Sequence, residues 1–274
     1  MRGRCARRPS AWSERSREGP ALEAVRLAGL CAAALCAGTI DAIAGGGGLI
    51  TVPALRVVGI PVDVVLGTNK GQTTFGSLSA LVNFWRGGKL DRARLPVAFA
   101  GGFVGALGGA RLVLQIPRAV LQVVVVVLLA AVAAVVLFRR NLGVHEDAPP
   151  PPDPLTRSAL IATAIGFYDG FFGPGTGTFL IMAFVAWMND SLTRATANAK
   201  VVNFASNVGS LVVFAIKGRV LWDVALPMAA AQFAGGALGA RLAVRYGNRF
   251  VRGVLLAVVA SLLAKLLWDL LASR

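Results

Sequence analysis

The chain has 274 residues, of which 56% are hydrophobic and only 15% are charged, whereas an ordinary soluble domain carries about 25% charged residues. A mean hydropathy of +0.68 and long uncharged runs indicate that lipid solvates much of the surface, because water does not tolerate so much exposed apolar area. The composition therefore predicts a membrane protein. With three cysteines and one histidine, His145, it excludes a disulfide scaffold and a His-based metal or proton site.

The formal net charge is +15, which in a soluble protein would suggest a nucleic-acid partner. Here the basic residues lie outside apolar runs or at their ends, and 10 of the 28 lie in the N-terminal tail, residues 1–21, and in loop 86–94. This is the positive-inside pattern of cytoplasmic segments, so we expect a bilayer, an inner (plasma) membrane location and a cytoplasmic N-terminus, and no nucleic acid. The apolar run after the tail continues into Thr39-Ile40-Asp41, so we expect the tail to be retained and not cleaved as a signal peptide.

A helix needs about 20 apolar residues to cross the hydrocarbon core, or fewer if its ends snorkel. This criterion predicts about eight transmembrane helices. They are Leu22–Ala44, Gly71–Trp85, Leu95–Leu114, Val120–Phe138, Ser158–Phe172, Val201–Ile216, Trp222–Leu242 and Phe250–Leu271. The fold class is therefore all-α and polytopic.

Two shorter apolar pieces, Leu49–Ile60 and Thr178–Met188, do not span alone, because each reaches only about 17 Å as a helix. Each follows a glycine-rich break. The breaks contain Gly45, Gly46, Gly47 and Gly48 in the first case and Gly173, Gly175 and Gly177 in the second. Lipid cannot satisfy the hydrogen bonds of a broken backbone, so the breaks mark the interior of the bundle.

The segment 139–157 is polar and proline-rich, which predicts a linker. It divides the chain into the tail, a first repeat over 22–138 and a second repeat over 158–274. Counting spans from a cytoplasmic N-terminus places the linker and loop 86–94 in the cytoplasm and loop 241–252 outside.

The two segments around the linker match each other with a shift of about 128 to 130 residues. Asp41 corresponds to Asp169, each four residues before a glycine cluster, and Lys70 corresponds to Lys200. Further matches are Phe84 with Phe214 and the tetrapeptide Gly109–Leu112 with Gly239–Leu242. A repeat with broken helices in corresponding places is typical of a secondary transporter with its substrate site at the repeat interface. Close packing of glycine-rich helices is the structural alternative.

Asp41 and Asp169 lie in apolar surroundings, where an ionised carboxylate costs a few kcal/mol unless it has a partner. They are candidates for proton coupling, or each caps the half-helix that follows it. Lys70 and Lys200 stand near the start of a predicted span beside polar side chains, which suggests an anion site that uses a helix N-terminus. A snorkelling interfacial lysine is the alternative. The polar neighbours are Thr68, Asn69 and Gln72 in the first half and Asn198 and Asn203 in the second.

Further polar residues follow at helical spacing, with Asn203 and Asn207 on one face and Gln72, Gly76, Ser79 and Asn83 in a similar stripe. They line a hydrophilic path or form interhelical hydrogen bonds. The run from Gly173 to Thr178 resembles an ATPase phosphate loop but lacks its lysine. We find no catalytic triad, metal cluster or cofactor motif, so we expect neither an enzyme nor a cofactor.

These residues resemble the sulfite exporter TauE/SafE family of bacterial and archaeal membrane proteins. The similarity begins near residue 25 and is most specific at Asp41 with Gly45–Gly48 and Pro53, at Gly67–Lys70, at Gly166–Gly177 and at Ala197–Asn203. It implies a permease of seven or eight helices in two homologous halves that moves sulfite, sulfoacetate or related anions. The arginine-rich tail and Asn198-Ala199-Lys200, in place of Thr68-Asn69-Lys70, depart from the usual pattern.

The sequence thus predicts a proton-coupled carrier that exports a small anion, sulfite or an organosulfonate. Lys70 and Lys200 would hold the anion, and Thr68, Asn69, Gln72, Asn198 and Asn203 would orient it. Two other functions fit the same features. One is a passive anion channel, and the other is a membrane assembly or scaffold protein that transports nothing.

Overall fold

The computed structural model describes residues 20–117 and 151–272, together with positions 119–121, 123, 124, 127 and 149. All regular structure in this part of the chain is α-helical, which confirms the predicted all-α fold class. Three of its helices, over 23–44, 95–113 and 192–216, are long and apolar enough to cross a membrane. Most of the predicted span 120–138, the tail to residue 19, and His145 with most of the linker lie outside the described residues.

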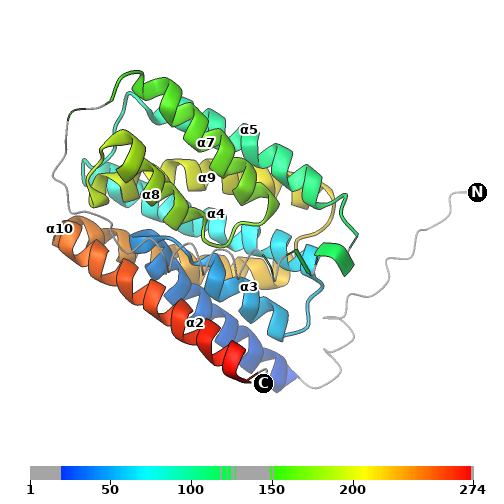
Figure 1. Cartoon of the computed structure of the whole chain (residues 1–274). Coiled ribbons are helices and arrows are strands. Elements are labelled where there is room, and N and C mark those ends of the chain that lie inside the picture. The colour runs from blue at the N-terminus through cyan, green and yellow to red at the C-terminus, as the bar shows by residue number, and fades with distance from the viewer. Residues whose placement is uncertain are drawn as a thin grey trace, which may run out of the picture.

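The helices follow the predicted order along the chain (Figure 1). They are α2 (Pro20–Ala44), α3 (Gly48–Val57), α4 (Val62–Arg86), α5 (Leu95–Val113), α7 (Pro154–Phe171), α8 (Thr176–Met188), α9 (Leu192–Ile216) and α10 (Trp222–Ala272). The last of these bends at Gly247, which has a φ of 67° and so leaves helical geometry. This bend separates the two spans that the sequence predicts within α10.

Helices α4 and α9 begin nine residues earlier than the predicted spans, at Val62 and Leu192. Lys70 and Lys200 therefore lie inside helices, and the prediction that they stand at the start of a span is wrong. The physical reason is that the polar residues of these first turns are buried in protein, not in lipid. A hydropathy criterion alone assigns such residues to a loop, although the helix continues through them.

The short helices α3 and α8 each reverse direction and run back along the helix before them (Figure 1). Ile60, three residues after the end of α3, packs in one cluster with Leu30 in the first half of α2. In the same way, Arg157 near the start of α7 donates a hydrogen bond of 3.4 Å to the carbonyl of Trp187 near the end of α8. The two short apolar pieces are thus half-helices of re-entrant hairpins.

These hairpins determine which segments share an end of the bundle. We call the end that holds the start of α2 the proximal end and the opposite end the distal end. Three segments meet around one pocket at the distal end, through Gly88, Lys89, Ser191, Thr193, Arg194, Val244, Gly247 and Asn248. Loops 86–94 and 241–252 therefore share an end. The prediction that these two loops lie on opposite faces is wrong, because each hairpin returns the chain to the side from which it came.

The helices form two groups that do not coincide with the two halves of the sequence. Helix α10 packs chiefly against α2 and α4, and with α3 these form bundle 1. Helix α5 packs chiefly against α7 and α9, and with α8 these form bundle 2. The two bundles meet mainly along α4 and α9, in the centre of the molecule (Figure 1). Bundle 1 thus contains α10 from the second half of the chain, and bundle 2 contains α5 from the first half.

Candidate functional site

The two glycine breaks cross each other in the middle of the molecule. Gly45 has a φ of +75°, and a Cβ atom there would lie 2.2 Å from the backbone nitrogen of Thr178 and 2.3 Å from the carbonyl carbon of Gly177. Only glycine allows so close a backbone approach. The breaks therefore lie in the protein interior, as the sequence predicts, and they place the starts of α3 and α8 next to each other.

Each aspartate organises the break that follows it. The carboxylate of Asp41 accepts a hydrogen bond of 3.2 Å from the backbone N–H of Gly47, which precedes α3. The carboxylate of Asp169 accepts one of 2.9 Å from the hydroxyl of Thr176, the first residue of α8. It also accepts a short hydrogen bond from Ser206. Neither aspartate caps a backbone N–H group within the half-helix itself: Asp41 holds the residue before α3, and Asp169 contacts the start of α8 through a hydroxyl.

The two lysines pair with these aspartates across the bundle interface. Lys70 of α4 forms an ion pair of 2.8 Å with Asp169 of α7, and both side chains are at most 4% exposed. Lys200 of α9 forms one of 2.8 Å with Asp41 of α2, and also donates to the Asp41 carbonyl. Each pair joins bundle 1 to bundle 2. The cluster holds two positive and two negative charges, which together cancel.

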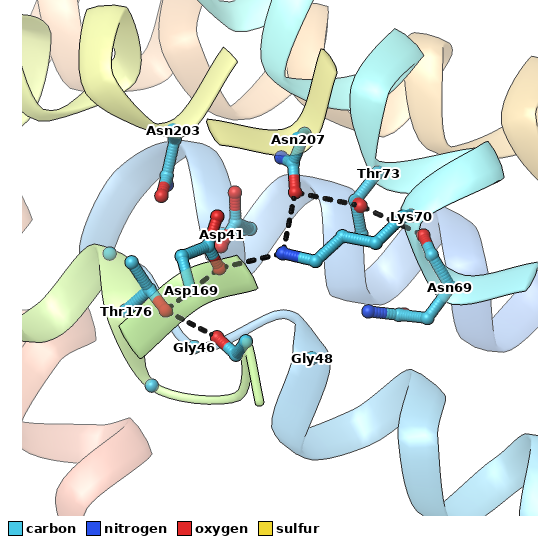
Figure 2. Close-up of a pocket in the computed structure, with 13 residues that line it drawn as sticks. Asp41, Gly46, Gly48, Asn69, Lys70, Thr73, Asp169, Thr176, Asn203 and Asn207 are labelled. Carbon is cyan, nitrogen blue, oxygen red and sulfur yellow. Dashed lines mark hydrogen bonds and ion pairs between the residues drawn. The ribbon is translucent and has the colours of Figure 1, made fainter. Parts of the chain in front are cut away.

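A pocket of about 20 Å³, room for roughly one water molecule, lies at this crossing. Figure 2 shows Lys70 reaching into it from α4, between Asp169 and the side-chain oxygen of Asn207, which accepts from Lys70 at 3.0 Å. Asn203 points into the pocket from α9. Of the residues predicted to form a site, the lining includes Asp41, Asn69, Lys70, Asp169, Asn203, Gly46, Gly48, Gly173, Gly175 and Gly177.

The other predicted binding residues lie outside this lining. Lys200 is fully buried behind Asp41. Gln72 donates to the Asn69 side chain at 3.1 Å, and the hydroxyl of Thr68 accepts from the backbone of Leu221 at 3.0 Å. The two lysines are therefore not equivalent, because only Lys70 faces the pocket.

Asn198 belongs to a separate polar cluster near the distal end. Its amide donates to Asp190 at 3.0 Å, and its oxygen accepts from the backbone N–H of Asp91 at 3.1 Å. Arg94 bridges the two carboxylates, at 2.7 Å from Asp91 and 2.8 Å from Asp190. Burial lowers the pKa of Arg94, but hydrogen bonds and charge from Asp190 and Asp91 outweigh burial and raise the pKa above its usual value. This charged cluster ties the start of α5 to the start of α9.

Three residues of the site were not among the predicted binding residues. Thr73 and Asn207 line the pocket, and the hydroxyl oxygen of Thr73 lies 3.3 Å from the amide oxygen of Asn207. Thr176 lines it from the start of α8. Asn207 could be found from the sequence, since it follows Asn203 by one helical turn in the predicted polar stripe. Thr73 has the same relation to Asn69. The position of Thr176 depends on the crossing of the two breaks, which no local pattern reports.

Comparisons with known proteins identify the family of the chain. The sequence profile of the family described as "Sulfite exporter TauE/SafE" matches residues 30–266. The chain belongs to the TauE/SafE family. It is 41% identical to "Probable membrane transporter protein ORF9" of Sinorhizobium sp. over 89% of this chain and 93% of that protein. No solved structure matches it significantly.

Other bacterial TauE/SafE relatives have similar names. The chain is 38% identical to "Probable membrane transporter protein YfcA" of Escherichia coli, over 86% of this chain and 87% of that protein. It is 37% identical to a "Probable membrane transporter protein" of Haemophilus influenzae, over 84% and 90%. The family assignment confirms the resemblance predicted from the sequence and establishes membership in a family of membrane transporters.

Proposed function

We propose that this TauE/SafE protein is a secondary carrier that exports a small oxyanion, sulfite or an organosulfonate, across the bacterial inner membrane. The observation that carries the proposal is the place of Lys70. Its ammonium group lies in a small pocket where two half-helices begin. A buried cation beside two helix N-termini is a favourable environment for an anion, because the helix dipoles add to the fixed charge.

Lys70 would bind the anion, and the amides of Asn69, Asn203 and Asn207 would orient it. An ammonium group has three donors, and in the closed structure Lys70 gives two of them to Asp169 and Asn207. The residues behind the pocket act indirectly. Lys200 holds Asp41, and Asp41 holds the break before α3.

Proton coupling follows from the charge balance of the site. With both aspartates ionised the four charges cancel, so an added anion would leave a buried net negative charge, which is costly in low dielectric. Protonation of Asp169 removes its charge and weakens its hold on Lys70. Protonation and anion binding are therefore linked at this site, and we propose that this linkage couples transport to protons.

The small size of the pocket supports a carrier more than a channel. It has room for about one water molecule, which is too little for an oxyanion with several heavy atoms. Apolar clusters also pack around the same helices: one contains Phe214, Leu66 and Phe172, and another contains Phe84 and Ala240. Transport would need bundle 1 and bundle 2 to move apart at one end at a time, which is alternating access.

The first test is flux into proteoliposomes of labelled sulfite, sulfate, sulfoacetate and chloride, with and without a pH gradient. A carrier gives saturable flux of a sulfur oxyanion that follows the gradient. Equal flux of every anion, without dependence on the gradient, would identify a channel. No flux from a folded preparation would favour the scaffold alternative.

Changing Lys70 to Ala is expected to reduce oxyanion flux to background, because the cation in the pocket is lost. The matched control is Lys89→Ala, which removes an exposed lysine at the distal end. Removing one partner of a buried ion pair can cost about 3–5 kcal/mol, so thermal unfolding in detergent must accompany the flux. The double variant K70M/D169N removes both charges and should stay folded but inactive; normal flux by either variant would contradict the proposal.

A further inference from the structure

A second pocket, of about 400 Å³, lies at the proximal end, away from the central site. Arg111 near the end of α5 and Lys217 and Arg219 after α9 supply three positive charges. The rest of the lining is Leu114, Gln115 and Val213, with no acidic residue. We call this the Arg111 pocket.

The acidic residue in contact with this pocket is Asp63, whose carboxylate lies 3.2 Å from Arg219. Among the described residues, Arg111 and Lys217 form no ion pair, and both are exposed. At most one of the three positive charges is therefore neutralised by that contact, and the pocket keeps an excess of positive charge.

Arg111 differs from the arginine that corresponds to it in the second half of the chain, which lies at the distal end. Arg241, in the matching tetrapeptide, donates to the side-chain oxygen of Asn83 at 3.0 Å. The position that corresponds to Asn83, by the same shift of 130 residues, is Val213, which lines the Arg111 pocket and offers no acceptor. Arg241 is thus hydrogen-bonded at the distal end, whereas the corresponding Arg111 is left available at the proximal end.

Helix α9 connects this pocket to the central site. It supplies Asn207 to the central pocket and Val213 to the Arg111 pocket, and Lys217 of the Arg111 pocket follows directly after its end. Ten residues of helix correspond to about 15 Å, and the two pockets share no lining residue. The Arg111 pocket is therefore distinct from the central site.

We propose that the Arg111 pocket is a second anion site, which binds a tetrahedral oxyanion group: a sulfate, sulfonate or phosphate. Guanidinium groups suit such a ligand because their paired donors match two of its oxygens. If the chain is an anion carrier, as proposed above, the pocket is the vestibule that concentrates substrate at the proximal end. The phosphate of an anionic lipid has the same chemistry, and the experiment distinguishes the two sources.

The experiment measures the local charge without relying on transport. Cys5, Cys31 and Cys36 are replaced by Ala, and exposed Gln115 is changed to Cys. The rates of reaction with an anionic and a cationic methanethiosulfonate are then compared in detergent. We expect the anionic reagent to react roughly tenfold faster. The double substitution R111Q/K217Q should abolish this preference, whereas Lys89→Gln at the distal end should leave it unchanged.

Protection experiments then identify the ligand. Inorganic sulfate should slow modification of the thiol severalfold more than chloride at equal ionic strength, and only while Arg111 and Lys217 are present. Protection by sulfate in neutral vesicles identifies a free anion, and protection that appears only in vesicles containing phosphatidylglycerol identifies a lipid headgroup. Equal rates for the two reagents, or no protection by either ligand, would overturn the proposal.

The outcome is separable from that of the carrier proposal. Lys70→Ala in the same background should abolish flux without changing protection by sulfate, because Lys70 lies in the other pocket. Sulfate protection in a protein that transports no anion would contradict only the carrier. Normal flux without protection or charge preference would contradict only the Arg111 pocket.

Discussion

Asp169 is the residue on which coupling depends in the proposed mechanism. It accepts hydrogen bonds from Lys70, Thr176 and Ser206, so three donors from three different helices hold its carboxylate in place. Asp41 has a different role, because its partner Lys200 does not face the pocket. The two aspartates occupy corresponding positions in the sequence repeat. Asp169 pairs with the lysine that faces the pocket, whereas Asp41 pairs with the lysine that does not.

Changing Asp169 to Asn imitates the protonated carboxyl group and is expected to uncouple transport. Oxyanion exchange should persist, since Lys70 is released, but a pH gradient should no longer drive accumulation. The comparison is Asp41→Asn, for which we expect gradient-driven flux to be reduced but still coupled. Gradient-driven accumulation by the Asp169 variant, measured in the same proteoliposomes, would show that the proton is carried elsewhere.

The crossing of the glycine breaks is the feature of greatest consequence among the secondary-structure elements. It brings the starts of α3 and α8 together although they are far apart in the sequence. A second close approach reinforces it, because a Cβ on Gly48 would lie 3.1 Å from the Cα of Pro174. The half-helices therefore cannot move past each other freely.

Gly45→Ala should destabilise the protein by several kcal/mol, because the new methyl group would overlap backbone atoms and the residue has a positive φ. Gly29→Ala in α2 is the matched control, since its Cβ would meet nothing within 4 Å. There the change should be neutral or stabilising by up to about 1 kcal/mol. Thermal unfolding in detergent compares the two; equal melting temperatures would contradict the described crossing.

On the scale of the whole molecule, the re-entrant hairpins fix which loops share a face of the membrane. The start of α2 lies at the proximal end and loop 86–94 at the distal end (Figure 1). The predictions of a cytoplasmic N-terminus and of a cytoplasmic loop 86–94 are therefore mutually exclusive. Both predictions were based on the positive-inside rule. They looked compatible only because the spans were counted without the two hairpins.

Labelling of single cysteines with an impermeant maleimide in intact cells tests this arrangement. In a chain without its native cysteines, Lys89→Cys and Arg245→Cys should behave alike, since both lie at the distal end. Lys217→Cys at the proximal end should behave in the opposite way. Labelling of Lys89→Cys and Lys217→Cys from the same side would refute the re-entrant topology.

The sequence allowed the fold class, the half-helices and most of the pocket lining to be predicted, because glycine clusters and charges within apolar runs are strong local signals. It did not reveal that Lys70 pairs with Asp169 and Lys200 with Asp41. That pairing depends on how α4 and α9 meet, which is a property of the assembled molecule. The true starts of these helices were missed because buried polar residues lower hydropathy without ending a helix.

The exchange of α5 and α10 between the bundles has a consequence for biosynthesis. Helix α5 packs on α7 and α9, which are synthesised after it. In the same way, α2 and α4 pack on α10, which is the last helix to be synthesised. Until residues 169 and 200 have been made, Lys70 and Asp41 have no counter-charge. The amino-terminal half is therefore an incomplete intermediate that the translocon must retain, and two fragments separated within the linker should be stable only when they are produced together.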